Sequence, residues 1–188
     1  MPIPPTERRA LAAVGARRAH PGSPTTADLI AALRRAGAES TELIALFDAR
    51  AVAGERHLLS AWAHLGRARS RGETRLRDRN AEFALFVAGD DQLPRALAKV
   101  GVRDDTEQFV VVAEKPRDVG ALVASFGLVE DPSAYPRTVD AAMLDRLGIG
   151  PSDRQVVPVS GWEGLVLERV ALLELSSGHA TAKSTAKH

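Results

Sequence analysis

Apolar residues are distributed along the chain in two alternating patterns. Short, nearly continuous apolar runs are typical of buried strands, and they occur at 9–14, 42–47, 82–88 and 109–113. Apolar residues spaced three or four positions apart predict helices, and this spacing occurs over 28–36, 53–69, 92–100, 116–126, 141–147 and 162–175. The chain therefore alternates predicted strands with predicted helices.

This alternation predicts an α/β or α+β fold, with a single mixed sheet of about four to five strands flanked by helices. Residues 128–139 are expected to form a loop that has room for a short strand at its start, and 155–159 fit neither period. The ends of the chain differ in composition from its middle. We expect a frayed N-terminus over 1–7, one domain over 8–176 and a disordered, low-complexity tail over 177–188.

The composition is that of an ordinary globular domain, with 45% hydrophobic and 26% charged residues. There is no cysteine, which excludes disulfides, thiolate metal sites and cysteine nucleophiles. No apolar run approaches the ~20 residues that span a membrane, and MPIPPTERR lacks the order of a secretion signal. We therefore expect a cytoplasmic protein without membrane contact. Its net charge is +1, so any affinity for nucleic acid must come from local clustering of cations.

The motifs that most directly indicate catalysis are absent from the sequence. It contains no phosphate-binding G-x-x-x-x-G-K-[ST], no G-x-G-x-x-G and no H-E-x-x-H. His57 and His64 are two helical turns apart, and packing explains them better than metal binding. Asp90 and Asp91 precede a predicted helix, where capping is the simpler role. We expect no catalytic residue, metal or cofactor, although a small-ligand enzyme or sensor on this scaffold stays open.

The densest charged feature is a set of six arginines within thirteen residues: Arg67, Arg69, Arg71, Arg75, Arg77 and Arg79. Guanidinium groups bind phosphate in a bidentate manner and stack on bases. The six arginines therefore predict an RNA-binding surface. Cations also stabilise the C-terminus of a helix, so a structural role is the alternative. Aromatic residues make up only 4% of the chain, which argues against an exposed stacking platform.

The predicted helix over 92–100 is the second candidate site. It has Leu93, Leu97 and Val100 on one stripe, flanked by Arg95 and Lys99, and it contains no acidic residue. Core packing alone would explain the stripe. Because the helix is short and its ends lie near the surface, we interpret the three apolar residues as a docking site for a protein partner.

Three blocks of sequence, in order, resemble the PRPK-binding-protein family, the small auxiliary subunit of the archaeal and eukaryotic KEOPS complex. The blocks are LFDARAVAGERHLLSAWAHLGRA at 46–68, AEFALFVAGDDQLPRALAKVGV at 81–102 and VLERVALLEL at 166–175. They lie within a similarity over about residues 40–176. The resemblance is to the archaeal type of the family.

The resemblance implies a small α/β sandwich that binds the atypical kinase of KEOPS and supports threonylcarbamoylation of the adenosine next to the anticodon. It implies a non-enzymatic subunit that holds the single-stranded 3′ CCA end of tRNA and meets the transferase subunit only indirectly. It also implies kinase contact near the helix over 92–100. A pure kinase-binding scaffold without RNA affinity is the closest alternative.

Overall fold

The computed structural model describes residues 11–38, 42–114 and 118–182, with side chains up to Leu175. Its elements are β1 (Leu11–Arg18), α2 (Thr26–Ala38), β2 (Ile44–Asp48), the 3₁₀ helix η1 (Ala49–Ala51), α3 (Glu55–Ser70), α4 (Arg79–Ala88), α5 (Leu93–Val100), β3 (Gln108–Glu114), α6 (Val119–Ser125), β4 (Leu128–Glu130), α7 (Ala141–Leu147), α8 (Pro151–Gln155), the 3₁₀ helix η2 (Val159–Gly161) and α9 (Trp162–Ala182).

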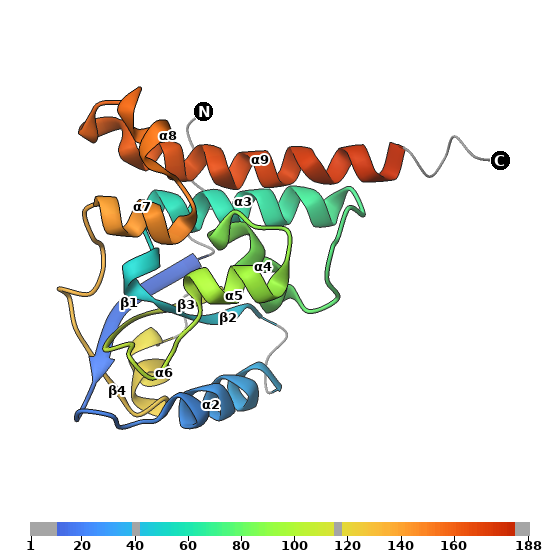
Figure 1. Cartoon of the computed structure of the whole chain (residues 1–188). Coiled ribbons are helices and arrows are strands. Elements are labelled where there is room, and N and C mark those ends of the chain that lie inside the picture. The colour runs from blue at the N-terminus through green and yellow to red at the C-terminus, as the bar shows by residue number, and fades with distance from the viewer. Residues whose placement is uncertain (1–10, 39–41, 115–117, 183–188) are drawn as a thin grey trace.

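The strands form one four-stranded sheet in the order β2-β3-β1-β4. All three pairings are antiparallel, so the sheet is not mixed. Helices cover both faces of the sheet (Figure 1). The prediction of a single sheet of about four to five strands flanked by helices is therefore confirmed, and the fold is α+β.

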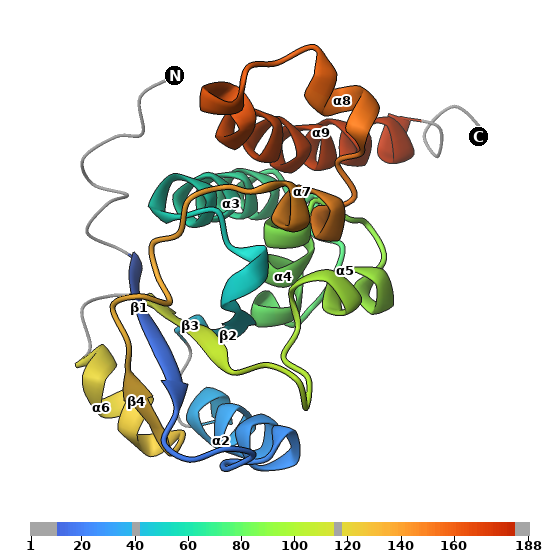
Figure 2. The ribbon, with the colours of Figure 1, turned by 60° about the vertical axis from the view of Figure 1, so that its left-hand side comes forward.

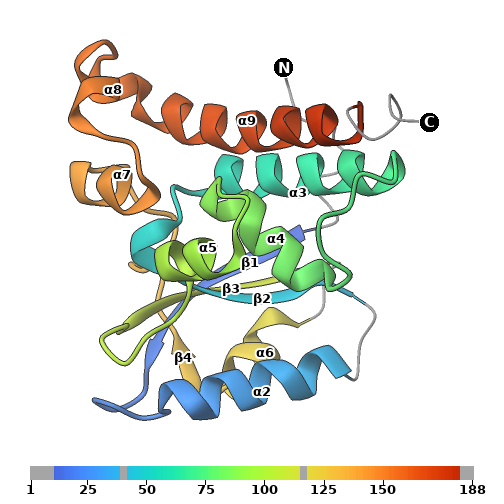
Figure 3. The same ribbon diagram turned by 45° about the vertical axis from the view of Figure 1, so that its right-hand side comes forward.

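The helices form three groups around the sheet. Helices α2 and α6 lie together on one face (Figure 2). Helices α3, α4, α5 and α7 lie on the opposite side, and α9 runs along the outside of α3 (Figure 3). Each face of the sheet thus has its own hydrophobic core.

Strand β3 supplies side chains to both cores. Phe109, Val111 and Ala113 pack in the core that contains α2 and α6. Val110 and Val112 pack in the core shared with α3 and α4. Successive side chains of a strand point to opposite faces, and all five are fully buried. This explains why the run over 109–113 is continuously apolar.

The strand predicted over 82–88 is wrong, because these residues belong to helix α4. Asp78 caps the helix by accepting hydrogen bonds from the amides of Asn80 and Ala81. Gly89 ends it in the left-handed conformation, at φ 57°. All residues from Glu82 to Ala88 are buried. A short helix that is buried on every side has no polar face, so its sequence cannot be told from a buried strand by periodicity.

The remaining predicted elements are found, with shifted ends. Strands β1, β2 and β3 correspond to the strands expected over 9–14, 42–47 and 109–113, and β4 is the short strand at the start of 128–139. Helices α2, α3, α5, α6, α7 and α9 correspond, in this order, to the helices expected over 28–36, 53–69, 92–100, 116–126, 141–147 and 162–175. Residues 9–10 and 116–117 of these predictions lie outside the described residues.

The predicted ends of the domain are only partly covered by the structure. The backbone of α9 continues to Ala182, past the expected boundary at residue 177. Residues 1–7 and 183–188 lie outside the described part of the chain, so the frayed N-terminus and the disordered tail stay predictions.

His57 joins the start of α3 to the end of α4 inside the core. Its Nδ1 accepts a hydrogen bond from the amide of Ala53 at 3.2 Å, so the proton of the neutral ring lies on Nε2. Nε2 donates to the carbonyl of Val87 at 2.9 Å. Complete burial lowers the pKa of His57 to about 4, despite the opposing hydrogen bond to Val87.

We predict that the protein loses stability as the pH falls from about 6.5 to about 4. The unfolded chain takes up a proton at His57 near pH 6.5, whereas the folded chain keeps this ring neutral down to about pH 4. The stabilisation is complete above pH 6.5, and its loss is on the order of 3 kcal/mol. Urea unfolding at several pH values measures the slope. His57→Gln should flatten it, and an unchanged slope in that variant would contradict the assignment.

His64 is the matched control for this experiment. Burial also lowers the pKa of His64, against the opposing hydrogen bond with Glu174. His64→Gln should therefore remove a separate part of the pH dependence and leave the contribution of His57 in place.

Two glycines provide a second test of the packing. A Cβ on Gly15 in β1 would clash with the carbonyl oxygen of Asp131 and lie 2.8 Å from the amide nitrogen of Tyr135. Gly15→Ala should therefore lower the free energy of unfolding by about 1–3 kcal/mol. A Cβ on Gly66, inside α3, meets nothing within 4 Å. Gly66→Ala should stabilise by about 0.5–1 kcal/mol. Chemical denaturation measures both, and equal effects would contradict the packing at Gly15.

Candidate functional site

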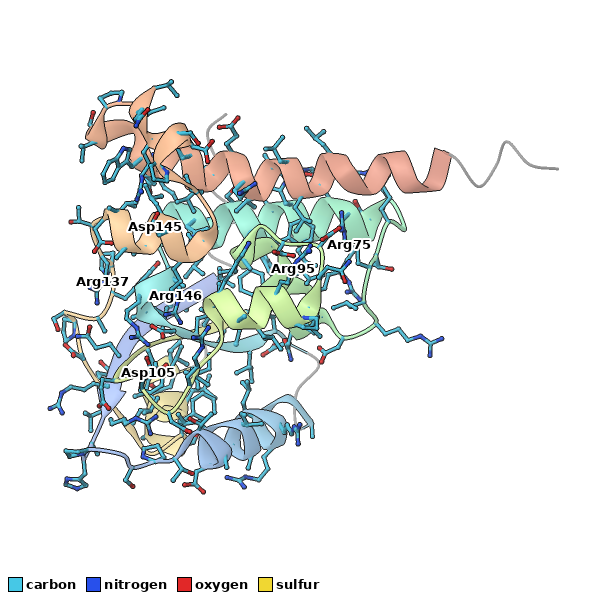
Figure 4. The ribbon with its side chains drawn as sticks, viewed as in Figure 1. Arg75, Arg95, Asp105, Arg137, Asp145 and Arg146 are labelled. Atoms are coloured by element: carbon cyan, nitrogen blue, oxygen red, sulfur yellow. The ribbon has the colours of Figure 1, made fainter. Side chains whose placement is uncertain are left out.

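The arginine-rich segment over 67–79 spans the end of α3, the connection to α4 and the first residue of α4. Figure 4 shows Arg75 in this connection, beneath α9. The structure brings the arginines close to carboxylates from distant parts of the chain. Five of the six have an acceptor among the described residues, and the acceptors determine what each arginine can do.

Glu174 of α9 is the meeting point of three cationic or protonatable side chains of the α3 segment. Arg71 binds one carboxylate oxygen through Nη2. Arg67 approaches the other oxygen at 3.3 Å, and Nδ1 of His64 hydrogen-bonds to the same oxygen. Burial alone would raise the pKa of the Glu174 carboxyl, but the hydrogen bonds from Arg71, His64 and Arg67 outweigh burial and lower it.

Glu82 and Glu114 hold three further arginines. The side chain of Glu82 is fully buried and accepts from Nη1 of Arg69 at 2.6 Å and from the amide of Arg75 at 2.8 Å. The guanidinium of Arg79 binds Glu114 through two nitrogens at 2.5 and 3.1 Å and lies 4.6 Å from the ring centroid of Trp62. These contacts fasten the segment to α4 and β3.

Arg77 differs from its neighbours in the segment. It is exposed, and no hydrogen bond or ion pair joins it to another described residue. Arg67 and Arg71 keep 45% and 44% of their side chains exposed despite their contacts with Glu174. Arg77, Arg67 and Arg71 are therefore the arginines best placed to meet an external anion. Arg69, Arg75 and Arg79 are more strongly engaged inside the fold.

The predicted docking stripe on α5 separates into buried and exposed residues. Val100 is fully buried, and Leu93 is partly buried against the same core. Leu97 keeps 47% of its surface exposed. Val100 has no surface in the free chain to offer a partner, so Leu97 is the residue of the stripe that can make first contact.

The cations beside the stripe are paired with the acidic turn before α5. Lys99 lies 2.9 Å from Asp90, and Arg95 binds both Asp90 and Asp91 at 3.0 and 2.7 Å. The N-cap residue is Gln92 rather than either aspartate, although its amide donates to Asp90. Burial raises the pKa of Asp90, but hydrogen bonds from Lys99, the Gln92 amide and Arg95 outweigh burial and hold it at about 2.

Other chemistry is limited in the part of the chain that the structure describes. No group of three or more histidine, aspartate or glutamate side chains there could hold a metal ion. None of the described helices is both long and apolar enough to cross a membrane.

Sequence reasoning missed the acidic partners of the arginines. Glu174 lies about a hundred positions beyond His64, Arg67 and Arg71 along the chain, and no local spacing connects them. The apolar run over 82–88 predicts a strand, so it does not reveal that Glu82 lies one helical turn into α4. The composition of the arginine-rich segment is the signal that could have indicated these partners, because several arginines next to a hydrophobic core require acidic side chains nearby.

Comparison with known families gives one informative match. The family model described as kinase binding protein CGI-121 matches residues 25–126. The matched part runs from the residue before α2 to the residue after α6, and it includes α5 and the whole arginine-rich segment. Helices α7, α8 and α9 lie outside the match. The curated proteins contain no match to the chain.

Proposed function

Because the chain belongs to the CGI-121 family of kinase binding proteins, we propose that it is a non-catalytic subunit of KEOPS, the complex that synthesises threonylcarbamoyl-adenosine in tRNA. In this proposal it binds the atypical kinase subunit and the 3′ CCA end of tRNA, needs no cofactor, and meets the transferase indirectly. The family match supports kinase binding most directly. The tRNA role rests on the resemblance of the sequence and on the arginine-rich segment.

Leu97 is the observation that best supports a kinase contact on α5. The described part of the chain exposes several large aliphatic side chains, and two of them lie in the segment that matches the family: Ile30 and Leu97. Ile30 lies on α2, on the opposite side of the sheet from α5. An exposed aliphatic residue next to paired charges is well suited to the centre of a protein interface, because it can be fully desolvated without leaving a charge unpaired.

Arg77 is the observation that best supports a phosphate contact. Its guanidinium is exposed and has no acceptor among the described residues, and the half-exposed Arg67 and Arg71 belong to the same segment. The ion pairs of the other arginines favour the second candidate, a kinase-binding scaffold without RNA affinity. The two candidates differ in a measurable way, because only the first predicts salt-dependent binding of tRNA.

We predict that Leu97→Glu weakens binding to the atypical kinase and leaves the fold intact. The substituted side chain lies at the surface of the free chain, but its carboxylate would be buried without a partner in the complex. Loss of at least tenfold in affinity is expected for a central position, as measured by calorimetry or pull-down. Ile30→Glu is the matched control. If Ile30→Glu abolishes binding and Leu97→Glu does not, the kinase contacts the layer of α2 instead.

We predict that Arg77→Glu weakens tRNA binding and lowers the slope of log K against log salt by about 1, because one phosphate contact is lost. Gel shifts at several salt concentrations measure both quantities. Arg34→Glu changes the charge equally on α2, on the other side of the sheet, and should have little effect. Wild-type protein should also bind tRNA more tightly than tRNA lacking CCA. No binding to tRNA even at low salt would favour the pure scaffold.

A further inference from the structure

Three side chains on one side of α3 converge on a single carboxylate of α9. His64, Arg67 and Arg71 are spaced three and four residues apart, so they project in the same direction from consecutive turns. All three contact Glu174, Arg71 through Oε1 and the other two through Oε2. Glu174 is 9% exposed. Where α3 packs against α9, these three side chains therefore form a small cationic cluster, the cradle, around the carboxylate of Glu174.

The geometry of this cradle suits a phosphate as well as a carboxylate. Guanidinium groups bind two oxygens of one phosphate, and a neutral imidazole can donate a further hydrogen bond. The imidazole of His64 is held nearly parallel to the ring of Phe86, with 6.4 Å between centroids, so its direction is fixed. Both arginines keep nearly half of their side chains exposed. A phosphodiester at the surface could reach them.

The three contacts with Glu174 are unequal, which makes an exchange feasible. Arg67 lies 3.3 and 3.4 Å from the carboxylate, longer than a strong charge-assisted hydrogen bond. Because the Arg67 side chain is 45% exposed, solvent screens this contact, and it contributes less to stability than a fully buried pair would. If Arg67 turned towards an external phosphate, Glu174 would still be held by Arg71 and His64. No charge would be left buried without a partner.

We infer that Arg67 and Arg71 form a phosphodiester-binding site at the edge of this cluster, and that Glu174, which His64 also holds, occupies their guanidinium groups in the free chain and limits their affinity for phosphate. This inference rests on the proposed tRNA-binding function. It identifies a part of the arginine-rich segment whose affinity for RNA is limited by a carboxylate of the same chain. Glu174 acts as an internal competitor, because its carboxylate and an RNA phosphate bind to the same guanidinium groups.

A purely structural role for Glu174 is the competing explanation. Helix α9 has other anchors, however, because Val166, Val170 and Leu173 are buried in the core shared with α3 and α4. The carbonyl of Leu173 also accepts from Arg75 at 2.8 Å. The attachment of α9 therefore does not depend on Glu174 alone, and the carboxylate can be removed in an experiment.

The test compares Glu174→Gln with Glu168→Gln in tRNA binding at several salt concentrations. Both variants remove one negative charge from α9, but Glu168 is exposed and lies outside the cluster. Glu174→Gln should bind tRNA several-fold more tightly than wild type and steepen the salt dependence by about 1–2, as one or two phosphate contacts are gained. Glu168→Gln should match wild type. Equal affinity of Glu174→Gln and wild type, or an equal gain in both variants, would overturn the inference.

Two further measurements keep the result interpretable. Adding Arg67→Gln to Glu174→Gln should abolish part of the gain, and an undiminished gain would count against the site. Modification of arginines by a dicarbonyl reagent, read by mass spectrometry on the wild-type chain, should show protection of Arg67 by tRNA. This second measurement needs no folded variant, and absence of protection would also overturn the inference.

The same samples separate this inference from the proposed function. Preference of the wild-type chain for tRNA with an intact CCA end tests the function. The ratio of the affinities of Glu174→Gln and wild type, measured with intact tRNA and with tRNA lacking CCA, tests the competing carboxylate. An equal gain on both RNAs without any CCA preference would support the site and reject the CCA-binding role.

Discussion

Three carboxylates in or close to the packed helical layer take their cationic partners from the arginine-rich segment. Glu82 is completely buried, while Glu114 and Glu174 keep 15% and 10% of their side chains exposed. Removing a carboxylate from water is costly unless a cation and hydrogen bonds replace the lost hydration. The arginine-rich segment supplies these partners and thereby joins α3, α4, β3 and α9. The first role of the segment is therefore to hold these elements together through ion pairs. An RNA-binding role depends on the guanidinium groups that stay exposed after these ion pairs have formed.

Helix α4 sets the distance between the two proposed binding surfaces. The arginine-rich connection leads into its N-terminus, and the acidic turn before α5 follows its C-terminus. The helix has ten residues, so at 1.5 Å per residue the two ends lie about 15 Å apart. Burial on all sides makes this spacing rigid. A kinase that contacts α5 and an RNA that contacts the arginines would thus be held at neighbouring positions, close enough for one partner to influence the other.

Much of the fold follows from local sequence patterns, and the parts that do not have identifiable physical causes. The continuous apolar run of β3 and the helical spacing of α2, α3 and α7 are patterns that a single sequence displays. Helix α4 has no polar face, so its period is invisible. The burial of Val100 depends on which side of α5 meets the core, which the stripe of Leu93, Leu97 and Val100 does not reveal. The pairing of Glu174 with Arg67 and Arg71 depends on the packing of α9 against α3, a contact between distant parts of the chain.

The internally paired arginines also bear on the proposed contact with RNA. With most guanidinium groups paired internally, the free chain should bind RNA weakly, because each phosphate contact must be made by a cation without a better acceptor. Weak binding is still useful when another subunit holds the same RNA. A second contact within one complex acts at an effective concentration in the millimolar range for short connections, so a few exposed arginines suffice. In the proposed assembly, low intrinsic affinity would also limit binding to unrelated nucleic acids, because those would lack the contacts made by the other subunits.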